Sequence, residues 1–222
     1  LGAPAREVSF TVPTGNFGDI FAGYIARQMG LPIKDLVVAT NQNDILHRCL
    51  KGEGYHKGET VPSVSPSMDI QVSSNFERAL YFAYDKDAGA VAQLMDELKN
   101  GGFEVSQGAM QALSETYISG RASEAETLAT IKAEVAASGE LLCPHGAVGV
   151  KVANELRETG VPMITLATAH PAKFPAAVEE ASGLYPPLPE RMADLYDRDE
   201  RVSQIANDLG AIEDHIRKNI AQ

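Results

Sequence analysis

A glycine-containing turn near the start of the chain, residues 13–19, holds the first residues whose types suggest chemistry. Five of them form a candidate anion site: Gly15, Asn16, Phe17, Gly18 and Asp19. Glycine permits backbone torsions and close approaches that other residues do not. If a helix follows such a turn, its first N–H groups have no partner and carry the positive end of the helix dipole. The turn is therefore a candidate phosphate site that needs no lysine or arginine. The alternative is an ordinary strand-to-helix turn with Asn16 or Asp19 as the helix cap.

Three other residues are candidate ligand contacts: Asn43, Ser67 and His145. Asn43 and His145 follow apolar segments, and Ser67 lies in a long segment rich in glycine, proline and serine. Asp44, next to Asn43, is expected to cap the helix that follows. The alternatives for the other two are an ordinary surface loop for Ser67 and structural hydrogen bonding for His145. Lys173 is expected to be a surface lysine at the start of a helix. No cysteine or histidine spacing fits a metal site, so none is predicted.

These residues need a scaffold, and apolar periodicity predicts one. Short apolar runs predict strands at residues 8–12, 36–40, 141–143 and 163–167. Helical spacing predicts helices at residues 20–29, 44–49, 75–99 (two helices, broken near 85–89), 107–117, 123–137, 147–158 and 173–181. This alternation favours an α/β fold, with an open, mostly parallel sheet and helices on both faces. Residues 1–185 are predicted to form this α/β region, and 186–222 a charged helical tail.

Composition narrows the function classes. The 222 residues carry a formal net charge of −11, which argues against nucleic acid as the main partner. Two cysteines, Cys49 and Cys143, do not make a disulfide framework and favour a reducing compartment. No apolar run approaches the roughly 20 residues of a membrane span. A cytoplasmic protein without membrane contacts is expected.

Six motifs follow one another in order along residues 12–174. They are VPTGNFGD (12–19), ATNQND (39–44), PSMDI (66–70), SNFER (74–78), PHGAVG (144–149) and TAHPAKF (168–174). Together they resemble threonine synthase, a fold-type-II enzyme that uses pyridoxal 5′-phosphate (PLP). One position departs from the family pattern, because Gly146 stands where PHTAVG has a threonine.

The resemblance implies a reaction and roles. The family converts O-phospho-L-homoserine and water to L-threonine and phosphate. Residues 15–19 would hold the PLP phosphate, and the Thr168 hydroxyl would meet the pyridine nitrogen. A neutral hydroxyl there does not force that nitrogen to stay protonated, whereas a carboxylate would favour the pyridinium form.

The family's Schiff-base lysine is expected upstream of the phosphate loop, in an SFKD-type motif. No lysine of this chain lies in such a motif, and none precedes Gly15. No catalytic residue is therefore assigned. The chain is expected to be a C-terminal fragment, inactive alone and prone to self-association through the face that the N-terminal half would cover. The alternatives are a non-catalytic phosphate-binding module and a related fold-type-II enzyme such as a threonine dehydratase.

Overall fold

The structure is a computed structural model that describes residues 1–220. It divides into two compact units, residues 1–187 and the segment that begins at Leu188. Each unit is described by itself. The sequence-based division into 1–185 and 186–222 stays a prediction, and residues 221–222 of that tail lie outside the described residues.

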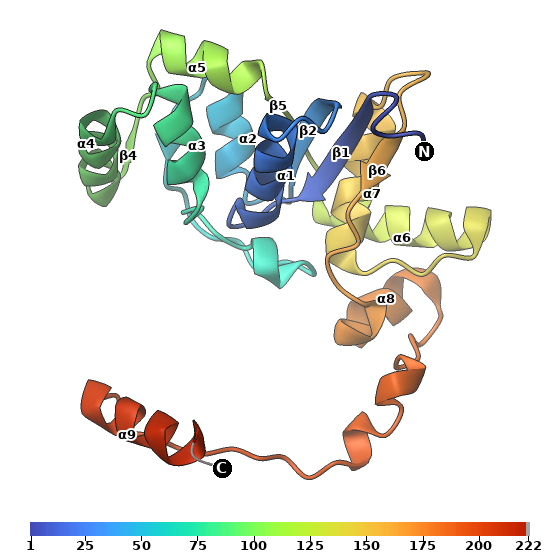
Figure 1. Cartoon of the computed structure of the whole chain (residues 1–222). Helices are drawn as coiled ribbons and strands as arrows, with labels where there is room; N and C mark the ends of the chain where they lie inside the picture. The colour runs from blue at the N-terminus through green and yellow to red at the C-terminus, as the bar shows by residue number, and fades with distance from the viewer. Residues whose placement is uncertain (221–222) are drawn as a thin grey trace. The chain divides into compact units, whose positions relative to one another are not determined.

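A four-stranded parallel sheet forms the centre of the first unit (Figure 1). Its order is β5-β2-β1-β6, and every pairing is parallel. The strands are β1 (Val8–Pro13), β2 (Ile33–Thr40), β5 (Tyr117–Arg121) and β6 (Met163–Thr165). Because parallel strands end at the same edge of a sheet, the loops after β1, β2 and β6 gather there.

Apolar side chains alternate between the two faces of β2, and each face has its own core. Leu36 and Val38 pack on the side of α1 (Gly18–Gln28), in a large aromatic-rich cluster. Val37 and Ala39 pack with Val148 and Val152, which belong to α7 (Pro144–Leu156). Helices therefore cover both faces, and the predicted α/β class with a mostly parallel sheet is confirmed.

Helix α7 approaches the sheet very closely. A Cβ on Gly149 would lie 2.7 Å from Thr165 Cγ2, and a Cβ on Gly120 would lie 2.7 Å from Val152 Cγ1. A larger residue at either position would push the helix off the sheet. This packing fixes the start of α7, which carries His145, relative to the edge where the loops gather.

The other elements of the first unit surround this core. They are α2 (Ile45–Leu50), β3 (Tyr55–His56), η1 (Pro66–Met68), α3 (Phe76–Ala83), α4 (Ala88–Lys99), β4 (Gly102–Phe103), α5 (Gln107–Ser114), α6 (Glu124–Ser138), η2 (Pro171–Lys173) and α8 (Pro175–Ser182). Strands β3 and β4 pair as a small antiparallel ribbon.

Two sequence-based predictions of secondary structure in the first unit are wrong, and strand β5 was not predicted. Residues 141–143 form no strand, because Cys143 is already the N-cap of α7 and its Sγ accepts the Gly146 N–H at 3.3 Å. The helix predicted to Tyr117 ends at Ser114, and Tyr117 begins β5. That strand contains Ser119 and Gly120, which hide its apolar pattern.

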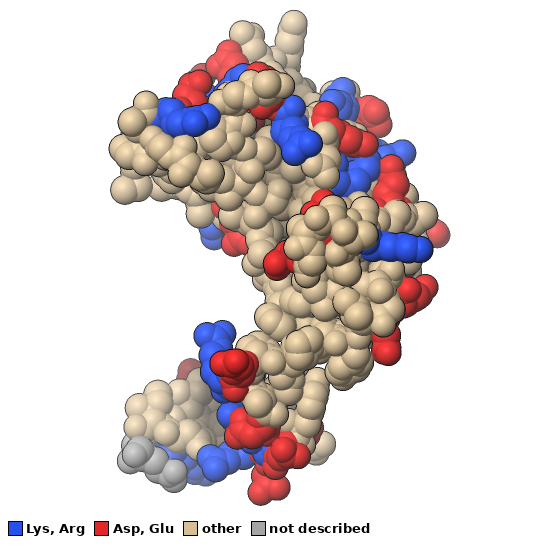
Figure 2. Space-filling view, turned by 90° about the vertical axis from the view of Figure 1, so that its right-hand side faces the viewer, with Lys and Arg blue, Asp and Glu red and all other residues tan. Residues whose placement is uncertain are grey.

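The second unit contains less helix than the sequence analysis predicts for the charged tail. Its elements are η3 (Glu190–Met192), η4 (Leu195–Asp197) and α9 (Leu209–Ile220). Residues 198–208 form neither helix nor strand. Among the described residues, no helix is both long and apolar enough to cross a bilayer. Figure 2 shows acidic and basic side chains interspersed on the face in view, without a broad basic patch.

Candidate functional site

The turn after β1 has one unusual backbone conformation. Phe17 lies in the left-handed region, at φ +67° and ψ +5°, directly before α1. Sequence reasoning gave the special torsions to the glycines, but the structure puts the positive φ on a bulky residue. Gly15 serves a close approach instead, because a Cβ there would lie 2.7 Å from the Ser67 carbonyl oxygen.

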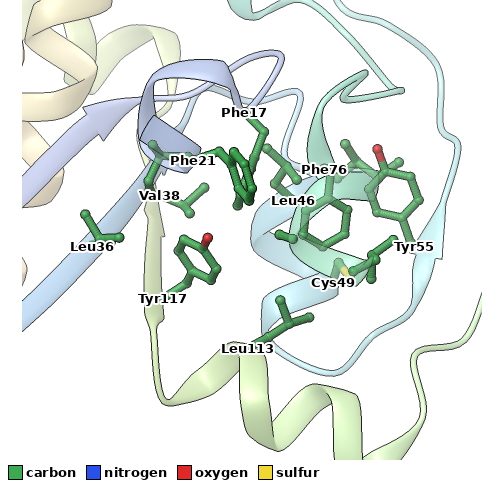
Figure 3. Packing of buried hydrophobic residues seen from close by; sticks show 14 of the residues in the cluster. Phe17, Phe21, Leu36, Val38, Leu46, Cys49, Tyr55, Phe76, Leu113 and Tyr117 are labelled. Carbon is green, nitrogen blue, oxygen red and sulfur yellow. The ribbon is translucent and has the colours of Figure 1, made fainter. Parts of the chain in front are cut away.

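Core packing holds Phe17 in this conformation. Its ring is 1% exposed and makes edge contacts with Phe76 and Tyr117, at centroid distances of 5.1 and 5.2 Å. Figure 3 shows the ring directed into this cluster. Phe17 can therefore offer a ligand only its backbone N–H. Such strain in a non-glycine residue is typical of functional sites.

The carbonyl groups of the turn are bound by the segment before α3. Ser73 Oγ donates to the Gly15 carbonyl at 2.8 Å. Asn75 donates both its backbone N–H and its Nδ2 to the Asn16 carbonyl, at 3.0 and 2.8 Å. With its acceptors occupied, the turn presents donors to its open side.

Those donors form a consecutive series. Within residues 1–220, the structure shows no hydrogen-bond acceptor for the N–H groups of residues 15–20. Consecutive free N–H groups at a helix start form a concave anion site. A cavity of about 190 Å³ lies there, lined by residues 12–20 and by Asn75. Asn75 was not singled out by sequence reasoning, although its SNFER motif was.

A second cavity, of about 180 Å³, brings most of the other candidates together. It shares Gly15, Asn16 and Asp19 with the first cavity, so the two adjoin. Its other lining residues include Ser67, Met68, His145, Thr168 and Lys173. Thr168 is exposed in the loop after β6. A larger cavity, of about 480 Å³, lies beside β6 and the end of α7, and none of its lining residues is a candidate.

His145 is the buried polar group of this second cavity. It is 4% exposed, and its Nε2 accepts the Ser67 N–H at 3.2 Å. The proton of the neutral ring therefore sits on Nδ1, which has no hydrogen-bond partner within the described residues. Burial lowers the pKa of His145, the nearby Lys173 ammonium lowers it further, and Asp69 opposes them. The ring thus stays neutral at pH 7.

Asn43 is not brought to either cavity. It is 3% exposed, and its Nδ2 donates to Asp69 Oδ1 and to the Val61 carbonyl, both at 2.9 Å. Its Oδ1 accepts the Val61 N–H at 2.8 Å. These bonds fix the 61–69 segment, on which Ser67 lies. A contact between Asn43 and substrate stays a prediction.

Asp44 occupies the N-cap position of α2 but does not cap it with its side chain. Its carboxylate binds two arginines instead, Arg48 at 3.0 Å and Arg121 at 2.7 Å. The expected capping role is therefore wrong. Arg121, at the end of the unpredicted strand β5, competes for the carboxylate. No cluster of metal-ligating side chains occurs within residues 1–220.

Comparisons with known proteins agree on one family. Residues 146–216 match the family model described as "Threonine synthase, C-terminal". The chain is 51% identical to a threonine synthase of Pseudomonas aeruginosa, over 96% of this chain and 46% of that protein. It is 42% identical to the Corynebacterium glutamicum threonine synthase, over 97% of this chain and 47% of that protein.

Solved structures give the same result. A PLP-bound threonine synthase from Brucella melitensis has a TM-score of 0.91 and 51% identity, over 98% of this chain and 47% of that one. Yeast threonine synthase has a TM-score of 0.84 and 37% identity, over 99% of this chain and 48% of that one.

Fold and comparisons together show that the chain has the α/β fold of the C-terminal part of threonine synthases, one of which was solved with PLP bound. The resemblance expected from the six motifs is confirmed, and the chain matches the C-terminal part of threonine synthases. It spans about half the length of the relatives that it matches.

Proposed function

We propose that this chain supplies the phosphate-binding part of a threonine synthase active site. In this proposal residues 15–20 bind the phosphate of PLP. The enzyme converts O-phospho-L-homoserine and water to L-threonine and phosphate. The observation that carries the proposal is the series of N–H groups, from Gly15 to Ile20, without an acceptor within residues 1–220. The similarity to a PLP-bound relative supports it.

The residues present fit a ligand with a phosphate at one end and a polar aromatic ring. The N–H-lined cavity is suited to a dianion, because the start of α1 adds partial positive charge. The adjoining cavity offers the Thr168 hydroxyl, Ser67 and the neutral His145. When bound, PLP supplies an electron sink for the bonds around the substrate α-carbon.

The chain's own residues act by binding and orienting. Ser73 and Asn75 hold the turn open by occupying its carbonyl groups. Thr168 would accept or donate one hydrogen bond at the ring nitrogen without fixing its charge. Asp69 holds the 61–69 segment by accepting from Asn41, Asn43 and Ser63, and so positions Ser67.

The proposal assigns the PLP aldehyde to no lysine of this chain, so we infer that turnover requires a lysine supplied by another segment. We also infer that this chain associates, either with that segment or with a second copy. Cys49 and Cys143 are both free and buried, which supports action in the reducing cytoplasm.

A binding experiment tests the phosphate role separately from the missing lysine. The probe is pyridoxine 5′-phosphate, which has the phosphate and ring but no aldehyde to react with amines. We expect saturable binding by calorimetry, weakened about tenfold or more in Gly18→Ala, since the added methyl obstructs close approach of the phosphate. Within this chain that Cβ meets only Asn75 Nδ2, at an ordinary 3.5 Å, so folding should be unaffected.

The matched control is Gly108→Ala, in α5, where a Cβ meets nothing within 4 Å. It should bind the probe as the parent chain does. Equal affinity in Gly18→Ala and Gly108→Ala would contradict the proposed site.

A further inference from the structure

Lys173 is the strongest unassigned group near the candidate site. Its side chain lines the second cavity with Gly15, Ser67 and Thr168. Within residues 1–220 it takes part in none of the ion pairs. In a chain of net charge −11, an ammonium group without a carboxylate partner is free to bind an external anion.

The surroundings hold this ammonium in place. Lys173 Nζ lies 5.7 Å from the centre of the Phe174 ring, a distance typical of cation–π contacts. The His145 ring lies 4.6 Å from the same Phe174 ring, centre to centre. The ammonium and the imidazole therefore both lie near one aromatic ring, and the Lys173 charge lowers the pKa of His145.

Lys173 is the one cationic residue among the described residues that line this cavity. The groups that face it are the Lys173 ammonium, the Asp19 carboxylate and the neutral His145. The free N–H groups of the turn account for one phosphate, and Lys173 lies outside that turn. The two cavities share lining residues, so a phosphate monoester in the second cavity would lie near the first phosphate, and a cation offsets the repulsion between two dianions.

We propose that Lys173 binds the phosphate group of the substrate, and the free phosphate after it is released. The inference rests on the proposed function and assigns to Lys173 a binding role, distinct from that of the phosphate loop. The bond is a charge-assisted contact to a phosphate oxygen, to which an ammonium donates. No covalent step is assigned to this amine.

Binding is tested on the chain saturated with pyridoxine 5′-phosphate. The ligands are O-phospho-L-homoserine, inorganic phosphate and L-homoserine, which lacks the phosphate. We expect Lys173→Met to weaken the first two about tenfold or more and to leave L-homoserine unchanged. Lys173→Arg should keep most of the affinity. Lys132→Met is the matched control, since Lys132 is also exposed, lies on α6 and takes part in no ion pair of the described residues.

A second readout does not depend on affinity. Phosphate bound at Lys173 stabilises the imidazolium form, so saturating inorganic phosphate should raise the pKa of His145, followed by NMR. This rise should be smaller in Lys173→Met than in Lys132→Met.

The outcomes separate the two proposals. If pyridoxine 5′-phosphate does not bind the parent chain, the proposed function fails. If it binds but Lys173→Met leaves both phosphate ligands unaffected, only the role of Lys173 is overturned. Equal weakening of pyridoxine 5′-phosphate and O-phospho-L-homoserine would also overturn it, because Lys173 would then belong to the cofactor site.

Discussion

Phe17 joins the core and the candidate site in one residue. Its ring lies among the aromatic side chains of the large core cluster, while its N–H belongs to the free donors of the turn. A left-handed φ in a bulky residue is uncommon and is retained only where the surroundings over-determine it. The core therefore supplies the free energy that holds the candidate anion-binding turn in shape.

Phe17→Ala should show this coupling. We expect the free energy of unfolding to fall by about 3–5 kcal/mol, because a large buried side chain is lost, and affinity for pyridoxine 5′-phosphate to fall with it. Urea denaturation measures the first effect. Ile25→Ala in α1 is the control, since Ile25 is 37% exposed and should change stability little. An unchanged midpoint in Phe17→Ala would contradict this account.

Asp69 has a comparable role for the 61–69 segment. Its Oδ1 accepts from three side chains, including Asn41 at 2.7 Å and Ser63 at 2.6 Å, and its Oδ2 accepts the Ser63 N–H at 2.8 Å. Asp69→Asn replaces one acceptor oxygen with a donor and leaves buried groups unpaired. We expect a loss of about 2–3 kcal/mol in the free energy of unfolding. The exposed Asp199→Asn is the control, and equal stability of the two variants would count against this role.

At the scale of elements, the sequence predicted helices correctly where a side-chain cap or the apolar period determines them. The helix predicted from residue 123 does begin there, where Ser123 and Glu126 form a capping box at the start of α6. The two helices between Asn75 and Lys99 also occur, with Asp87 capping the second. Strand β5 and the early start of α7 were missed, because Ser119 and Gly120 hide the apolar pattern of the strand and the Cys143 thiol caps the helix.

The capping box makes a pH-dependent contribution to stability. Hydrogen bonds from Ser123 lower the pKa of Glu126 from 4.5 to about 2, with Lys151 adding to the effect. Since the folded-state pKa is depressed, this stabilisation is present above pH 4.5 and is lost as the pH falls toward 2. Ser123→Ala should cost about 1 kcal/mol at pH 7.

The difference between the parent chain and Ser123→Ala should shrink as the pH falls from 5 to 2. Thermal unfolding across that range measures it. Ser114→Ala is the control, because Ser114 Oγ donates only to the Gln111 carbonyl. A difference that stays constant with pH would show that Glu126 does not contribute in this way.

At the scale of the whole molecule, the order of the six motifs carried more information about the family than any single predicted helix or strand. The resemblance identified the family and the fold. Sequence alone missed the contacts that distinguish the candidate residues. It named both Asn43 and His145, whereas of these two His145 lines the second cavity and Asn43 does not. Such contacts join residues that are far apart in the sequence and so cannot be predicted from it, since Ser67 and His145 are 78 residues apart.

In the proposed function this chain binds the PLP phosphate and another segment supplies the lysine, which predicts how this chain behaves in isolation. Because no lysine here is assigned to the PLP aldehyde, we expect no conversion of O-phospho-L-homoserine to threonine when PLP is added. Threonine formation is followed by amino-acid analysis. Supplying a polypeptide with the SFKD-type lysine motif should restore turnover if it associates with this chain. Turnover by this chain alone would overturn the assignment.

The central claim is that the N–H groups of residues 15–20 bind a phosphate. The most direct measurement is a ¹⁵N-edited NMR titration of this chain with pyridoxine 5′-phosphate. We predict downfield shifts of the amide protons from Gly15 to Ile20, largest at the start of α1, and no comparable shifts around the other cavity beside β6. Shifts that spare residues 15–20 while the ligand binds would contradict the account.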